Sequence, residues 1–79
     1  MSRYFFHLPG APNGIDLEGT ELATLADARL DAVRCAGQML ADNPGQFWNA
    51  GEFTMRVSDA RHLTLFQLTF FATDCPAIA

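Results

Sequence analysis

The fold is decided by the stretch Phe53-Thr54-Met55-Arg56-Val57-Ser58 and by the run that follows it, Leu63-Thr64-Leu65-Phe66-Gln67-Leu68-Thr69-Phe70-Phe71. In the first segment apolar and polar residues alternate strictly, and a period of two is typical of a half-buried β-strand. The second segment is rich in residues that favour strands, and the polar residues 59–62 separate the two. We therefore predict an antiparallel hairpin.

The register of this hairpin decides which side chains enter the core. An even connection puts the apolar rows of both strands on one side, whereas an odd connection turns the second strand over. We expect the even register, because it creates a single dry face. The apolar rows are then Phe53, Met55 and Val57, and Phe66, Leu68 and Phe70. The opposite face carries Thr54, Arg56 and Ser58, and Leu65, Gln67, Thr69 and Phe71.

A second pair of strands is expected before the hairpin. Residues 3–8 form an aromatic strand that turns Tyr4, Phe6 and Leu8 to one side. Residues 9–14 are dense in turn formers, including Asn13-Gly14, and residues 15–18 read as a short strand with an acidic side that suits a sheet edge. The opening and last strands are apolar on both sides, so we expect both to lie away from the edges of the sheet.

One helix is predicted over residues 25–42, with Thr24 as its N-cap. Its apolar positions fall on one arc, and many of them are alanine, which lets a helix lie close to a sheet of bulky side chains. Pro44 and Gly45 end it, and residues 46–51 are expected to be a connection whose aromatics cover one end of the core. The prediction is an α+β fold: a two-layer ββαββ domain, with one helix packed on one face of a mostly antiparallel four-stranded sheet.

Length and composition narrow the class of protein. Seventy-nine residues make a single domain over residues 1–79, with an expected flexible tail at 72–79. The net charge is −4 and the chain has no lysine, which argues against binding to a phosphate backbone. We expect no signal peptide, because no long apolar run follows the first residues, and no apolar run is long enough to span a bilayer. The two cysteines fit no metal or redox spacing, so we expect a reduced, cytoplasmic protein.

Candidate chemistry is sparse. His7, His62, Cys35 and Cys75 could gather around zinc, but structural zinc sites use short paired spacings that are absent here. No Ser-His-acid set follows from the spacing, and a pocket in so small a core should fall below the ligand volumes of about 300 Å³ or more. We therefore expect no enzyme activity, no metal and no cofactor.

Several segments together resemble a known family. They are Ser2-Arg3-Tyr4-Phe5-Phe6-His7, Glu18-Gly19-Thr20-Glu21-Leu22, Ala28-Arg29, and Val57-Ser58-Asp59 leading to Leu65 and Leu68-Thr69-Phe70. In these segments the chain is similar to a family of small bacterial proteins that is classed as a domain of unknown function and opens with a Pro-Arg-Tyr-Phe-Phe-His-type strand. Ser2 and Thr69 stand where that family usually has proline, and His62 where its hairpin turn usually has glycine. The resemblance implies the fold and a bacterial source, and it implies no activity.

Arg29 lies inside the apolar arc of the predicted helix. It can snorkel, with its stem on the sheet and its guanidinium in water. It can instead pair with Glu18 or Glu21, which precede the helix, and so tie the helix start to the first hairpin. The sequence leaves both possibilities open.

The outer face of the sheet is the surface left for function. Arginine and aromatic residues, which are enriched in protein interfaces, gather on it. We predict protein–protein association, with a homodimer as the expected form and another protein as a possible partner. The alternative is a nucleic-acid-linked regulator that binds single-stranded RNA or DNA on the same face. The predicted interface residues are Arg3, Phe5, His7, Arg56, Leu65, Gln67 and Phe71.

Overall fold

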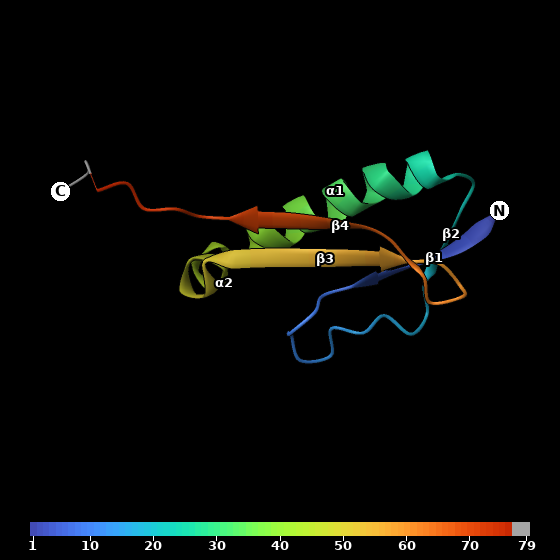
Figure 1. Cartoon of the computed structure of the whole chain (residues 1–79), viewed down its shortest axis with the longest axis horizontal. Helices are drawn as coiled ribbons and strands as arrows, with labels where there is room; N and C mark the ends of the chain where they lie inside the picture. Colours follow the sequence, from blue (N-terminus) through green and yellow to red (C-terminus); the bar gives the residue numbers. More distant parts are fainter. Residues whose placement is uncertain (77–79) are drawn as a thin grey trace.

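A four-stranded antiparallel sheet with a helix on one face forms the frame of the molecule (Figure 1). The computed structural model describes residues 1–76. The elements are β1 (Ser2–His7), β2 (Thr20–Leu22), α1 (Leu25–Asp42), α2 (Pro44–Ala50), β3 (Glu52–Ser58) and β4 (Thr64–Phe71). The strands are ordered β2-β1-β3-β4, and each pair of neighbours is antiparallel. The fold is α+β, as predicted.

The hairpin of β3 and β4 has the even register. Met55 lies opposite Leu68 and Val57 opposite Phe66, so both apolar rows face the same side. In the connecting turn, the Asp59 carboxylate accepts the N–H groups of Arg61 and Leu63. His62 has a φ of 67°, a left-handed conformation that normally favours glycine. The register shifts by one residue between Val57 and Ser58, which leaves Leu65 as an extra residue of β4.

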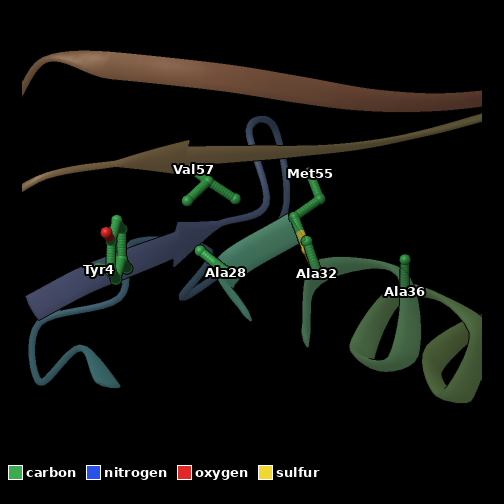
Figure 2. Close-up of a cluster of buried hydrophobic side chains, with 6 residues drawn as sticks. All are labelled: Tyr4, Ala28, Ala32, Ala36, Met55 and Val57. Carbon is green, nitrogen blue, oxygen red and sulfur yellow. The ribbon is translucent and has the colours of Figure 1, made fainter. Parts of the chain in front are cut away.

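Helix α1 begins and ends where the sequence predicts. The Thr24 hydroxyl accepts the N–H of Asp27 at 3.1 Å, which satisfies one of the free donors of the first turn. Three alanines spaced four apart, Ala28, Ala32 and Ala36, are completely buried. They lie against the bulky side chains of Tyr4, Met55 and Val57 in the centre of the core (Figure 2).

The chain between β1 and α1 differs from the prediction. Residues 15–18 form no strand, and the second strand is β2, further along the chain. The Asp16 carboxylate accepts the N–H groups of Glu18 and Gly19 and bends the backbone into a turn, so this segment cannot run straight. Ile15 and Leu17 point their apolar side chains into solvent.

Two further expectations are wrong. The connection after α1 contains a second helix, α2, which begins with Pro44 in its first turn and ends at Gly51 in the left-handed conformation. Strand β4 lies at the edge of the sheet, whereas the sequence favoured an interior position for it; β1 does lie inside.

The C-terminal segment leaves the body of the molecule beside α2 (Figure 1). Ala72 donates its N–H to the carbonyl of Gly51 and extends the pairing of β3 and β4 by one residue. Residues 73–76 are exposed and belong to no helix or strand. The predicted tail, 72–79, continues into residues 77–79, which lie outside the described residues.

Candidate functional site

The outer face of the sheet, opposite α1, holds the predicted interface residues. Neighbouring strands place Phe5 beside Ser58, His7 beside Arg56, and Arg56 beside Gln67. The two ends of this face differ. Over β1 the face is covered by the segment 8–19 of the same chain, and over β4 it is open.

Asp16 attaches the segment 8–19 to β1. Strand β2 pairs with β1 only as far as Tyr4, and beyond it the Asp16 carboxylate accepts the N–H of Phe6 at 3.1 Å. The carboxylate also accepts the N–H groups of Glu18 and Gly19. It therefore takes the place of a strand partner at the edge of β1 and closes a turn at the same time.

The surroundings of Asp16 favour its ionised form. Burial raises the pKa of the carboxyl group, but the N–H groups of Gly19, Phe6 and Glu18 outweigh burial and lower the pKa below its ordinary value. A charged Asp16 therefore stabilises the folded segment.

His7 links Asp16 to Ser58. The backbone N–H of Asp16 donates to His7 Nδ1 at 3.1 Å, so this nitrogen carries no proton. The proton of the neutral ring is then on Nε2, which lies 3.0 Å from the Ser58 hydroxyl and donates to it. Ser58 is only 5% exposed. The His7 ring also stacks in parallel with Phe5.

This arrangement contains the residue types of a Ser-His-Asp triad in a different geometry. A catalytic histidine takes the proton of the serine through an unprotonated nitrogen, and the carboxylate holds the other ring N–H. Here the nitrogen beside Ser58 holds the proton, and a backbone N–H occupies the other nitrogen. The hydrogen bonds fix the segment 8–19 to the sheet and do not activate the hydroxyl.

Arg3, and not Arg29, is the partner of the acidic residues before the helix. Arg3 forms an ion pair with Glu21 at 3.2 Å and donates to the backbone carbonyl of Glu18. Because Arg3 and Glu21 lie directly opposite each other on β1 and β2, the sheet itself brings them together. Arg29 is exposed on α1 and makes no ion pair within residues 1–76. The predicted pair of Arg29 with Glu18 or Glu21 is therefore wrong.

Gly19 allows the segment 8–19 to approach β1 closely. Its φ is +73°, and a Cβ atom here would lie 2.8 Å from Arg3 Cγ and 2.9 Å from Phe5 Cε2. Phe5 and His7 are consequently half-buried, although the sequence placed them on an open face.

The β4 end of the outer face is open. Phe71 is 72% exposed, and Leu65, the extra residue of β4, is exposed as well. Polar contacts between β3 and β4 are long: Arg56 Nε lies 3.4 Å from Gln67 Oε1, and the hydroxyls of Thr54 and Thr69 are 3.5 Å apart. Of the predicted interface residues, Arg56, Leu65, Gln67 and Phe71 are therefore exposed together.

A cleft of about 500 Å³ opens between residues 8–12, the end of α1 and α2. The prediction that any pocket would fall below about 300 Å³ is wrong, because α2 and residues 8–12 line this cleft together with the end of α1 and the start of β3. Apolar side chains, among them Leu8, Met39, Phe47 and Phe53, line much of it. Asp16, Cys35 and Asp59, the groups with shifted pKa within the described residues, all lie away from it.

The candidate zinc ligands are scattered. Within residues 1–76, no three His, Cys, Asp or Glu side chains lie close enough together to hold a metal ion. Cys35 is half-buried on α1 and Cys75 is exposed after β4. Burial and the Asp31 carboxylate raise the pKa of the Cys35 thiol against the opposing effect of Arg34, so less of this thiol is in the reactive thiolate form.

Comparisons with known proteins agree with the resemblance to a domain of unknown function. Among the residues that the structure describes, no helix has the length and apolarity needed to cross a membrane. No curated protein and no solved structure matches the chain. One family model, described as a domain of unknown function, matches residues 3–72. Because this match extends over nearly the whole sequence, the chain belongs to the DUF6894 family.

Proposed function

We propose that this chain is a protein-association module that forms a homodimer through the β4 side of its sheet and has no catalytic step of its own. The observation that carries the proposal is the exposure of apolar side chains on β4. Phe71 on the outer face is 72% exposed, Phe70 on the inner face is 41% exposed, and Leu65 is exposed at the other end of the strand. Large apolar side chains gathered along one strand are typical of a contact surface.

The size of the domain supports self-association. The fully buried core consists mainly of three alanines, Met55 and Val57, which is a small apolar core even for 79 residues. Domains of this size often gain stability from a second copy. A two-fold dimer is the simplest arrangement, because one patch then meets its own copy.

The β1 end of the outer face contributes little to the proposed interface. Phe5 and His7 are covered by the segment 8–19, and Arg3 is engaged by Glu21 and the carbonyl of Glu18. A substitution at Phe5 would therefore disturb the fold before it disturbed an interface.

The test is the molar mass in solution, measured by light scattering across a range of concentrations. We expect a dimer for the wild type and a monomer for Phe71→Glu, because the carboxylate would be carried into the apolar contact. Leu17→Glu is the matched control: Leu17 is 86% exposed in the segment 8–19, and this variant should remain dimeric. A wild type that stays monomeric at the highest concentration would overturn the proposal.

A further inference from the structure

The free edge of β4 exposes backbone N–H and C=O groups in addition to apolar side chains. We infer that β4 pairs antiparallel with β4 of a second copy, so that two sheets join edge to edge into one. This inference rests on the proposed self-association and gives it a defined geometry. A face-to-face dimer would use the same strand without using its backbone.

The backbone groups available for pairing can be identified from β3. Ala72 donates its N–H to Gly51, so Ala72 and, by the alternation of an antiparallel ladder, Phe70 and Leu68 direct their backbone groups toward β3. The groups of Gln67, Thr69 and Phe71 therefore point away from the sheet. Each offers a donor and an acceptor along the free edge.

The extra residue Leu65, near the start of β4, is a device that discourages pairing with another strand, and residues 66–71 carry none. Natural edge strands are usually short, or carry charge or proline. The other edge of this sheet, β2, has three residues and includes Glu21. By contrast β4 has eight residues and contains no charged residue and no proline.

The sequence of β4 is complementary to itself. In an antiparallel pair about a two-fold axis, residues on the same face lie opposite each other. In the register centred on Leu68, this residue meets its own copy, Phe66 meets the partner's Phe70, and Gln67 meets the partner's Thr69. Apolar residues thus face apolar residues, and polar residues face polar ones.

The residue pattern of β4 favours a second copy as the occupant, and the lack of charge on the strand permits it. Each chain has a net charge of −4, which would normally oppose self-association, but β4 itself brings no like charges together. The inner face of β4 is apolar, and its outer face carries Leu65 and Phe71 beside Gln67 and Thr69, although the strand lies at the edge of the monomer. Pairing with a second copy makes it an interior strand.

The inner face of β4 also gains cover. Helix α1 packs against β2 and β3, and it leaves Phe66 and Leu68 half-buried and Phe70 41% exposed. In the joined sheet Leu68 lies next to its copy and Phe66 next to the partner's Phe70, between the two α1 helices, which stand on the same face. The same pairing therefore buries backbone and apolar surface.

A proline at position 69 separates this geometry from other dimers. Thr69→Pro removes an N–H that points to the free edge and leaves the bonds to β3 in place. Thr69→Val keeps the N–H and serves as the matched control. We expect a folded monomer for the proline variant and a dimer for the valine variant, by light scattering and circular dichroism.

The outcomes are distinct. A monomeric wild type overturns the proposed function and this inference together. A dimeric Thr69→Pro variant overturns the edge pairing and leaves self-association intact. If the proline variant does not fold, a cross-linking experiment tests the edge pairing in its place.

The cross-linking experiment uses single cysteines in a background with Cys35→Ala and Cys75→Ser. Gln67→Cys and Thr69→Cys proteins are prepared separately and then oxidised alone or as a mixture. Directly opposed Cα atoms in an antiparallel pair are about 5.5 Å apart, which suits a disulfide. Disulfide dimers in the mixture, with little in either protein alone, are the expected result. Equal cross-linking in all three samples, or none in any, would overturn the Leu68-centred pairing.

Discussion

Asp16 is the residue on which the attachment of the segment 8–19 to the sheet depends. Its carboxylate accepts three backbone N–H groups, those of Phe6, Glu18 and Gly19. Those of Phe6 and Gly19 are partly buried and would be left without an acceptor if the carboxylate were removed. We expect Asp16→Ala to lower the free energy of unfolding by about 1–3 kcal/mol, measured by urea denaturation. Asp16→Asn keeps one acceptor oxygen and should lose less. An unchanged midpoint in Asp16→Ala would contradict this role.

The lowered pKa of Asp16 predicts a dependence of stability on pH. Because the pKa in the folded state lies below the unfolded value of about 3.9, ionised Asp16 stabilises the fold fully above that value. The contribution is lost as the pH falls through the folded pKa. The free energy of unfolding of Asp16→Asn should therefore decline less steeply between about pH 5 and pH 2 than that of the wild type.

Asp59 provides a second, independent test of the same pH dependence, because its pKa is lowered as well. The N–H of Leu63 is the main cause of the lowered pKa of Asp59, and it outweighs the desolvation that raises it; Arg61 lowers it further. Asp59→Asn should flatten the same part of the profile independently, because the two carboxylates share no partner. Identical slopes for the wild type and Asp16→Asn would show that the carboxylate of Asp16 is not preferentially ionised in the fold.

His62 occupies the strained position of the hairpin turn. A residue with a Cβ in the left-handed region is strained, and glycine in its place removes that strain. The greater freedom of glycine in the unfolded chain offsets part of this stabilisation. We expect His62→Gly to raise the free energy of unfolding by about 0.5–1 kcal/mol. Ala60→Gly, in the same turn with an ordinary φ, should lower it or leave it unchanged. A loss of stability in His62→Gly would show that the imidazole contributes more than the strain costs.

At the scale of elements, the alanine stripe of α1 sets the distance between helix and sheet. Ala32 is completely buried against the centre of the core, so a larger side chain must push the two layers apart. Ala32→Leu should lower the free energy of unfolding by about 1–3 kcal/mol. Ala41→Leu on the exposed side of the same helix should change it by less than about 0.5 kcal/mol. Thermal unfolding of both variants tests the comparison, and an equal effect would contradict it.

The elements that could be predicted are those with local signals. The alternation from Phe53 to Ser58 and the cap at Thr24 lie within a few residues of the structure they specify, and both are found as expected. Helix α2 was missed because Pro44 and Gly45 stop one helix in the sequence pattern while Pro44 begins the next. The sequence does contain a signal for α2: proline is favoured in the first turn of a helix and glycine just past its end, and Pro44 and Gly51 occupy these positions.

The attachments of the segment 8–19 could not be predicted because they join distant residues. His7 and Ser58 are 51 positions apart, and Asp16 reaches Phe6 only after the chain has turned. The misplaced strand at residues 15–18 has the same origin, since the carboxylate of Asp16 competes with strand formation through its own backbone neighbours. An aspartate with a glycine three residues later, as in Asp16 and Gly19, is a turn signal that the alternation concealed.

At the scale of the whole molecule, the edge position of β4 follows from sheet order. The sequence pattern of β4 describes an interior strand, and in the proposed dimer that pattern and the sheet order agree. Stability would then depend on protein concentration, because a dimer that binds only folded chains shifts the unfolding equilibrium by mass action. We expect the wild-type melting temperature to rise with concentration and that of Thr69→Pro to stay constant. A wild-type melting temperature independent of concentration would argue against coupling between folding and association.

Amide hydrogen exchange tests the same geometry without any substitution. The N–H groups of Leu68 and Phe70 point toward β3 and should be protected at every concentration, because their bonds lie within one chain. Those of Gln67, Thr69 and Phe71 point to the free edge and have a partner only in the joined sheet. At high concentration all five should exchange slowly, and on dilution below the dissociation constant the three edge groups alone should become fast. Edge groups that exchange rapidly in a sample shown to be dimeric would place the contact on a face of the sheet and exclude strand pairing.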